Sequence, residues 1–381
     1  MLIWRFKNEF VVVKLVSFFL FSLLSLSCFG QKFQQFLPTT ITAKSKVGFL
    51  IAHRANMAHL PQKNVGAIEL DFSQQDRSAT TWARTYKQPV KGVSFMYQNF
   101  GNPNALGHGY SIFAHTSFPL VQRARFGFLD FRLGSGIAYV TKRYDAQLNP
   151  KNNAIGSHVN GFVNLQFNWM KHFEFWHIGA GIEFTHYSNA SIRTPNLGLN
   201  IPSLNFNLGY SIQRRQLYSP NRKKDDPSNY DATMVDDIHV SILGGVKQNV
   251  ITQSEPVYRG IIGIQGMYSK RISRKWKLDF ALDLTYNDAN KHFHDDSLYT
   301  FGQTFQAGGY FGGSIHFYNT EFIVGIGVYA YNQINPWGWV YNRLGFRYHF
   351  GEKITAQVAI KAHLGIADYL EFGIGYRLWD K

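Results

Sequence analysis

The chain is built from short segments in which apolar and polar residues alternate, and this pattern constrains the fold more than any other feature. Between Trp276 and Tyr286, every second residue is apolar, whereas the intervening positions carry mainly Lys, Asp and Thr. The segments 343–350, 354–364 and 369–378 show the same division. A period of two places successive side chains on opposite faces of a β-strand. The sequence therefore predicts many strands that each have one apolar face.

Such a complete apolar face indicates contact with lipid. Strands of about ten residues with apolar residues outside, charged residues inside and aromatic residues near the ends are typical of outer-membrane barrels. The chain is 16% aromatic and contains 34 glycines, a composition that a soluble β-sandwich can also have. Because lipid offers no water to an open sheet edge, a sheet in a membrane must close on itself. We expect an all-β chain forming a transmembrane antiparallel β-barrel, with the soluble sandwich as the alternative.

Sixteen segments have this character, and we expect 12–16 strands. The segments are 46–56, 64–75, 91–99, 106–115, 126–140, 158–169, 175–188, 204–213, 237–247, 258–269, 275–287, 302–318, 321–331, 339–350, 353–364 and 368–378. Short turns alternate with longer polar loops, as in barrels whose two ends are periplasmic. The connection 214–236 breaks this alternation because it is long, charged and on the periplasmic side. A single barrel over 31–381 is favoured, with 214–236 as a charged linker loop and 237–381 as additional strands. Two eight-stranded barrels are the alternative.

Residues 1–30 have the features of a secretory signal peptide. A basic start is followed by the apolar core 15–26 and by a small-residue cleavage site that ends at Gly30. The single cysteine, Cys28, lies inside this segment, and a lipoprotein with Cys28 as its lipidated first residue is the alternative. After cleavage at Gly30 the chain would have no disulfide. The formal net charge of +15 suits an anionic partner outside the cytoplasm, such as the lipopolysaccharide headgroup. No nucleic acid partner is expected there.

The segment 175–188 places two chemically reactive residues at the end of an apolar strand face. His186 and Ser188 continue the stripe that begins with Trp176 and includes Ile182. Residues i and i+2 of a strand start about 6.6 Å apart on one face, so an imidazole can approach a hydroxyl. A serine nucleophile needs such a base within hydrogen-bond reach. Parity puts this pair on the lipid-facing side, at the outer end of the strand.

The run His186-Tyr187-Ser188-Asn189-Ala190, followed by Pro-Asn-Leu-Gly-Leu-Asn at 195–200, resembles the active-site motif of the lipid A 3-O-deacylase (PagL-type) family of acyloxyacyl hydrolase-like outer-membrane proteins. Residues 46–213 are similar, more loosely, to that family's eight-stranded barrel. The resemblance implies a carboxylic ester hydrolase that removes an ester-linked acyl chain from lipid A in the outer leaflet. Ser188 then matches the nucleophile and His186 the base. Asn189 and Asn196 match positions beside the reacting centre that could serve an oxyanion hole.

The sequence departs from the family at one catalytic position, because the expected glutamate aligns with Asn200. An amide oxygen can fix the histidine tautomer, as the Asn of Cys-His-Asn sites does. It stabilises an imidazolium less well than a carboxylate does. No Asp or Glu lies between Glu183 and Asp225, and Glu183 has the opposite parity to His186. Asn200 shares the outward parity of Leu204, and paired strands lie about 4.8 Å apart, so contact with His186 is expected.

Ester hydrolysis by this set requires no metal and no cofactor. A non-enzymatic outer-membrane barrel, either a porin or a structural protein that binds lipopolysaccharide, is the alternative function. A channel would need a continuous water path, whereas an esterase on the lipid face tolerates a filled interior. Inward parity of Lys361, His363, Glu371 and Arg377 predicts a charged network inside the barrel.

Overall fold

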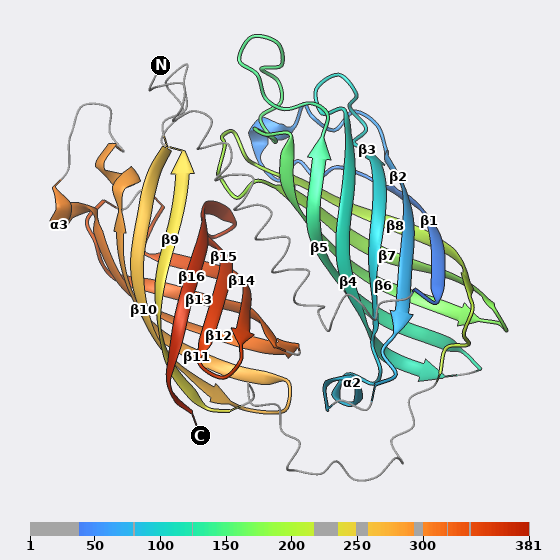
Figure 1. The fold of residues 1–381 in the computed structure, drawn as a ribbon. Coiled ribbons are helices and arrows are strands. Elements are labelled where there is room, and N and C mark those ends of the chain that lie inside the picture. Colours follow the sequence, from blue (N-terminus) through green and yellow to red (C-terminus); the bar gives the residue numbers. More distant parts are fainter. Residues whose placement is uncertain are drawn as a thin grey trace, which may run out of the picture. The chain divides into compact units, whose positions relative to one another are not determined.

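The computed structural model describes residues 38–78, 81–123, 125–216, 235–248, 258–292, 300–317, 319–334 and 337–380. The predicted signal peptide with Cys28, and most of the predicted linker 214–236, lie outside the described residues. Sixteen antiparallel strands form two closed barrels, one from β1 to β8 and one from β9 to β16 (Figure 1). Across these residues, none of the helices has the length and hydropathy of a membrane span.

The first barrel contains eight strands, a 3-10 helix after β1 and a short α-helix after β2. Its elements are β1 (Thr40–Gly48), η2 (Ala55–Met57), β2 (Val65–Gln75), α2 (Thr81–Thr85), β3 (Val90–Asn99), β4 (His108–Arg123), β5 (Gly127–Val140), β6 (Val159–His172), β7 (Trp176–Ser188) and β8 (Leu199–Ser211). Strand β1 closes the sheet by pairing with β8, from Thr40 opposite Ser211 to Gly48 opposite Ser203. Every strand of this sheet therefore has two neighbours.

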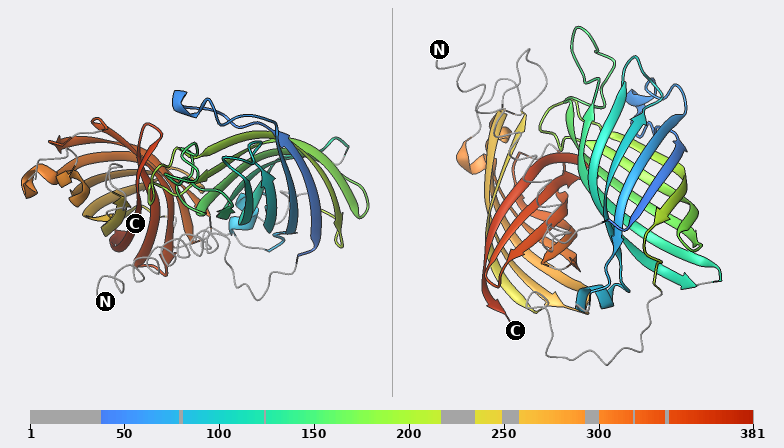
Figure 2. Two further views of the ribbon diagram at one scale, coloured as in Figure 1. Left: turned by 90° about the horizontal axis from the view of Figure 1, so that it is seen from above. Right: turned by 45° about the vertical axis from the view of Figure 1, so that its right-hand side comes forward.

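The second barrel is closed in the same way. Its elements are β9 (Asp237–Gln248), β10 (Tyr258–Arg271), β11 (Trp276–Asn287), η4 (Asp288–His292), α3 (Phe301–Thr304), β12 (Phe305–Phe317), β13 (Thr320–Asn332), β14 (Val340–Phe350), β15 (Ile354–His363) and β16 (Ile366–Asp380). Strand β16 pairs with β9 from Leu370 opposite Val246 to Asp380 opposite Asp237. Figure 2 shows the tilted strands of each barrel in two further views.

The predicted all-β antiparallel barrel class is confirmed, and the sixteen strands of the described residues fall within the expected 12–16, but the favoured single barrel is wrong. Alternation along a strand reports which face meets lipid and carries no information about which strand lies beside it. The return of β8 to β1 closes the first sheet before the connection 214–236 begins. The expected strand 46–56 is also misplaced, because β1 ends at Gly48 and a loop follows. An unbroken apolar run, Phe49-Leu50-Ile51, directly follows the strand and resembles its continuation in the sequence.

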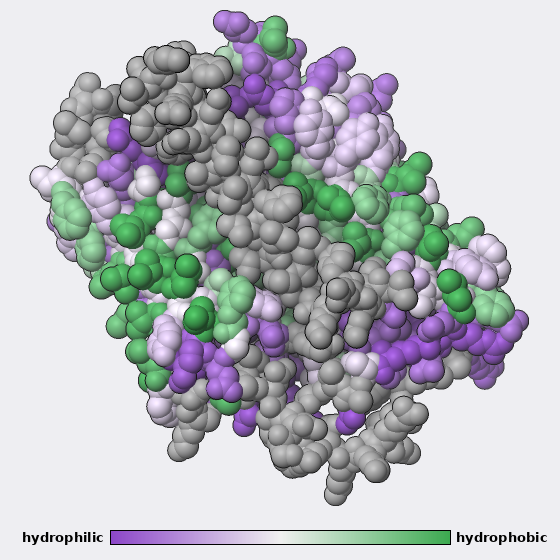
Figure 3. All heavy atoms as spheres, in the orientation of Figure 1, coloured by the Kyte–Doolittle hydropathy of each residue, from purple (hydrophilic) through white to green (hydrophobic). Residues whose placement is uncertain are grey.

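The outward faces of both barrels are apolar, as the alternation predicts. Trp176 and Ile182 on β7, and Leu282 on β11, are among many large apolar side chains that remain exposed. On the face shown in Figure 3, hydrophobic residues gather over the middle of the strands and hydrophilic residues lie toward the strand ends. In water such a surface would be strongly unfavourable. The surface is that of a barrel in lipid.

The barrel interiors are filled by buried charged side chains. In the first barrel, Arg132 on β5 reaches Glu69 on β2 at 2.7 Å, and Lys46 bridges Glu69 at 2.6 Å and Glu183 at 2.8 Å. Strands β2 and β5 are not neighbours in the sheet, so Arg132 spans the lumen. In the second barrel, Arg343 likewise joins Asp283 and Glu371. The four inward residues predicted for the last two strands are all buried, Lys361, His363, Glu371 and Arg377.

Candidate active site

The end of β7 separates inward from outward side chains as predicted. Thr185 and Tyr187 are buried inside the barrel, whereas His186 and Ser188 lie on the outward face and are half-buried. Glu183 points inward and pairs with Lys46, so it is not an acid for this site. The alternation therefore brings the imidazole and the hydroxyl to one face of one strand.

Tyr187 anchors this end of the strand from the inside. Its ring packs edge-on against Phe100 and Phe162, with ring centroids 5.1 Å apart in both cases, and its hydroxyl donates to Gln98. Aromatic pairs of this geometry contribute about 0.5–1.5 kcal/mol beyond their buried area. Because Tyr187 lies between His186 and Ser188 in the chain, its packing limits the movement of both.

His186 contacts Asn200, as the parity of the two strands predicts. The residues are cross-strand partners on β7 and β8, and the imidazole Nδ1 lies 2.6 Å from the amide Oδ1. With the proton on Nδ1, the ring donates to Oδ1 and presents the lone pair of Nε2 as a base. An amide oxygen thus occupies the position that a triad carboxylate would fill.

Asn200 has a second partner that the sequence does not reveal. The amide Nδ2 lies 3.1 Å from Nδ1 of His53, which is 147 positions away in the chain. Two backbone hydrogen bonds hold the loop after β1 against β8, from the N–H of Phe49 to the carbonyl of Pro202 at 3.2 Å and from the N–H of Ile51 to the carbonyl of Asn200 at 2.9 Å. This loop carries His53 to the amide.

Gly198 lies close to the imidazole of His186. Its φ is +79°, and a Cβ built there would lie 2.9 Å from Cε1 of His186. Its N–H donates to the carbonyl of Ala154 at 2.9 Å, which fixes the turn. Only glycine combines this backbone conformation with so close an approach. Gly198 was visible in the sequence as part of the 195–200 motif, but the motif alone does not show that this glycine lies against His186.

Asn189 and Asn196 bond to each other in the connection between β7 and β8. The N–H of Asn189 donates to Oδ1 of Asn196 at 3.0 Å. The side-chain amide of Asn189 also donates to the carbonyl of Arg193 at 2.9 Å and accepts from its N–H at 3.3 Å. Both asparagines therefore shape the loop that directly follows Ser188.

An apolar groove of about 660 Å³ lies on the outer surface of the first barrel. Its lining includes nine large or rigid apolar side chains, Val47, Phe49, Phe131, Leu165, Phe167, Ile182, Phe184, Pro202 and Leu204. Phe184 and Pro202 are cross-strand partners, two positions along their strands from His186 and Asn200. The groove thus begins beside the His186–Asn200 pair.

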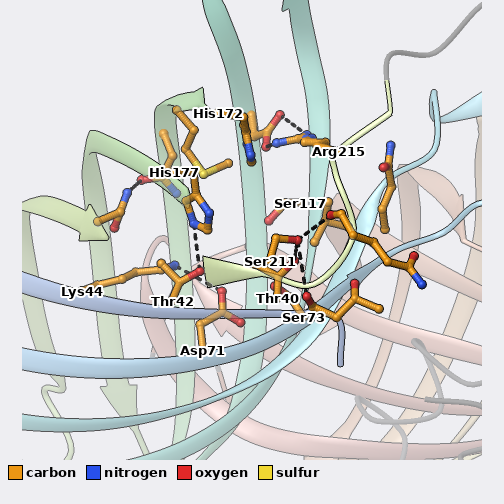
Figure 4. Close-up of a pocket in the computed structure, with 18 of the residues that line it drawn as sticks. Thr40, Thr42, Lys44, Asp71, Ser73, Ser117, His172, His177, Ser211 and Arg215 are labelled. Carbon is orange, nitrogen blue, oxygen red and sulfur yellow. Dashed lines mark hydrogen bonds and ion pairs between the residues drawn. The ribbon is translucent and has the colours of Figure 1, made fainter. Parts of the chain in front are cut away.

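A smaller cavity of about 60 Å³ lies inside the first barrel, at the opposite end of its strands (Figure 4). His177 bonds Thr42 there at 3.0 Å, and Arg215 forms a bidentate pair with Asp130 at 2.7 and 2.9 Å. None of the predicted site residues lines this cavity. Within the described ranges, no group of three or more His, Cys, Asp and Glu side chains is arranged to hold a metal ion.

Two family models match the chain, one within the first barrel from Ile68 in β2 to the end of β8, and one over the second barrel. Residues 68–211 match the model of lipid A 3-O-deacylase (PagL), and residues 236–381 match that of the acyloxyacyl hydrolase C-terminal domain. No curated protein matches the chain.

The solved structures that match include two outer-membrane proteins and a porin. The outer membrane enzyme PagL is 15% identical, with 44% of this chain and 97% of that chain covered and a TM-score of 0.31. A triple mutant of the Rhodopseudomonas blastica porin is 9% identical, with 89% and 99% covered and a TM-score of 0.18. The outer membrane protein Omp33 of Acinetobacter baumannii is 7% identical, with 90% and 99% covered and a TM-score of 0.16.

The His-Tyr-Ser-Asn motif at the end of β7 lies within the first matched range, and the second matched range covers the whole second barrel. The chain is a β-barrel protein of the bacterial outer membrane. Its first barrel is similar, from residue 68 to residue 211, to the lipid A 3-O-deacylase (PagL) family, and its second barrel is similar to the acyloxyacyl hydrolase C-terminal domain.

Proposed function

We propose that the first barrel is a serine esterase that removes an ester-linked acyl chain from lipid A of lipopolysaccharide. The observation that carries this proposal is the 2.6 Å hydrogen bond between His186 and Asn200. His186 lies two residues before Ser188 in β7, and both side chains are on the lipid-facing surface. Neither a soluble ester nor a transported solute would need a nucleophile and base on that side. A lipid in the outer leaflet would reach them laterally.

The chemistry follows from the orientation of the imidazole. With its Nδ1 proton held by Asn200, His186 uses Nε2 to take the proton of Ser188 as Oγ attacks the ester carbonyl. Collapse of the tetrahedral intermediate releases the sugar hydroxyl, which takes the proton from His186. Water then hydrolyses the acyl-serine by the same route and yields a free fatty acid. We assign oxyanion stabilisation to the loop that holds Asn189 and Asn196.

The neutral Asn200 sets a limit on the rate. It fixes the tautomer of His186 but balances the charge of the imidazolium only weakly. We therefore expect slower turnover than an enzyme with a carboxylate at this position would have.

The apolar groove supports an acyl ester as the substrate. Its nearest lining residues on β7 and β8, Phe184 and Pro202, lie two positions from His186 and Asn200, and its lining is mainly apolar. Burial of an acyl chain contributes about 0.8 kcal/mol for each CH₂ group removed from water. The acyl chain of a membrane lipid already lies in an apolar medium and gains little of this free energy on entering the groove. The main effect of the groove would therefore be to align the acyl chain with Ser188.

Buried ion pairs favour the esterase over a porin. Arg132 and Glu69 meet inside the first barrel, and Arg343 and Asp283 meet inside the second. These pairs occupy interior space that a water path would need. Conductance recording on the inserted protein addresses the alternative, and large steady channels would argue against a purely enzymatic role.

The test is mass spectrometry of lipid A from a host that lacks deacylase activity. We expect the protein to remove one acyl group, and Ser188→Ala and His186→Ala to abolish this change. Ser45→Ala is the matched control, because Ser45 is also an exposed, lipid-facing serine of the first barrel. Unchanged lipid A with correctly folded protein in the membrane would overturn the proposal.

A further inference from the structure

We propose that His53 is a positioning residue of this site, which fixes the direction of the Asn200 amide and through it the tautomer of His186. The inference rests on the esterase function proposed above. It starts from a difference between an amide and a carboxylate. Both oxygens of a carboxylate accept hydrogen bonds, whereas an amide presents one acceptor and one donor of nearly equal shape.

Only one direction of the Asn200 amide makes His186 a base toward Ser188. With Oδ1 toward the ring, the imidazole proton stays on Nδ1 and Nε2 is open. With the NH₂ group toward the ring, Nδ1 must offer its lone pair, and the proton moves to Nε2. In that tautomer His186 cannot take the proton of Ser188, and a triad with the wrong tautomer loses about 10⁴-fold in kcat.

His53 selects the productive direction. Its Nδ1 lies 3.1 Å from Nδ2 of Asn200, and as an acceptor it binds the NH₂ group and leaves Oδ1 for His186. The hydrogen bonds then run in one sense, from His186 Nδ1 to Asn200 Oδ1 and from Asn200 Nδ2 to His53 Nδ1. The proton of His53 is accordingly on its Nε2.

The backbone holds this contact at the right place. The N–H of Ile51 donates to the carbonyl of Asn200 itself, so the loop that carries His53 is fixed to the residue that His53 orients. His53 is exposed, and it has no role in the packing of the barrel core. A histidine here thus compensates for an amide where the family has a carboxylate.

The test compares His53→Leu in two backgrounds, with kcat and KM measured on a lipid A ester in detergent micelles. In the parent protein, His53→Leu should lower kcat about tenfold and leave KM unchanged. His53→Asn, whose Oδ1 replaces Nδ1 as an acceptor, should retain at least half of kcat. In an Asn200→Asp background, His53→Leu should change kcat less than twofold, because a carboxylate has no direction to select.

Each alternative result overturns the inference. An unchanged kcat in His53→Leu shows that the contact does not matter. An equal loss in the Asn200→Asp background shows a general effect on the loop, and a raised KM with parental kcat shows contact with the lipid headgroup.

A second measurement keeps this result separate from the proposed function. The ¹⁵N shifts of the His186 ring, identified by comparison with His186→Ala, report its tautomer without turnover. We expect Nδ1 to carry the proton in the parent protein and a mixture of tautomers in His53→Leu. An unchanged tautomer in His53→Leu overturns the inference even if the enzyme is active. An inactive parent protein with the expected tautomers would overturn the proposed function alone.

Discussion

Nδ1 of His186 lies 2.6 Å from Oδ1 of Asn200, and the two residues are directly opposed on neighbouring strands although fourteen positions separate them in the chain. The sheet itself therefore sets their distance. Asn200, a neutral side chain, orients the imidazole of His186. A single substitution at Asn200 can change the charge at this position or remove the hydrogen bond.

Substitutions of Asn200 should separate orientation from charge. Asn200→Ala removes the acceptor of the Nδ1 proton, and we expect kcat to fall about 100-fold or more. Asn200→Asp keeps an oxygen at the same place and adds a charge that stabilises the imidazolium, so kcat should rise. Steady-state kinetics on a lipid A ester give both values. Parental turnover in Asn200→Ala would contradict the assigned role.

Gly198→Ala should impair catalysis more than it impairs folding. The new Cβ would lie 2.9 Å from Cε1 of His186 and must displace the imidazole. We expect a loss of about tenfold in kcat. Gly351→Ala is the matched control, since Gly351 also has a positive φ, of +66°, but an added Cβ meets nothing within 4 Å. Both variants carry backbone strain of about 1 kcal/mol, so equal activities would show that the contact with His186 is unimportant.

Filling the apolar groove should change the preferred acyl length. Ile182→Trp adds bulk inside the groove, and hydrolysis of long-chain esters should fall several-fold relative to short-chain esters. Leu208→Trp serves as the control because Leu208 is lipid-facing and exposed on β8 but does not line the groove. Rates on a series of acyl esters measure the shift. A parallel loss on all chain lengths would mean that the groove does not hold the acyl chain.

Loss of an interior carboxylate should destabilise the first barrel. Glu69→Leu leaves Lys44, Lys46 and Arg132 without their shared partner, and removal of one member of a buried ion pair costs about 3–5 kcal/mol. Glu174→Ala breaks the exposed pair with Arg214 and should cost less than about 1 kcal/mol. Urea unfolding in lipid vesicles gives both free energies of unfolding. Equal values would show that the interior network contributes little.

The local pattern of the sequence was enough to predict the face of the strands on which the candidate site residues lie. His186, Ser188 and Asn200 share one parity, and the structure puts all three on the outward surface. The same pattern located fifteen of the sixteen strands in the described part of the chain and misplaced β1, because alternation is strong only where a strand meets lipid on one side and polar groups on the other.

Contacts between distant segments could not be read from the sequence. His53 belongs to a region that the alternation assigned to a strand, and its partner lies 147 positions away. The pairing of β8 with β1 is likewise a long-range event that no local period encodes. The role of Gly198, which directly precedes β8, depends on the position of the His186 imidazole on β7.

The closure of each sheet on itself affects how such a chain can evolve. Fusion of a second closed barrel leaves no unpaired strand edge in the first, because β1 already bonds to β8 along its whole length. A genetic exchange between the segments that encode β8 and β9 would preserve every strand pair of the barrel that contains His186 and Ser188. Loss or replacement of the second barrel would therefore leave every strand pair of the first barrel in place, including the pairing of His186 with Asn200.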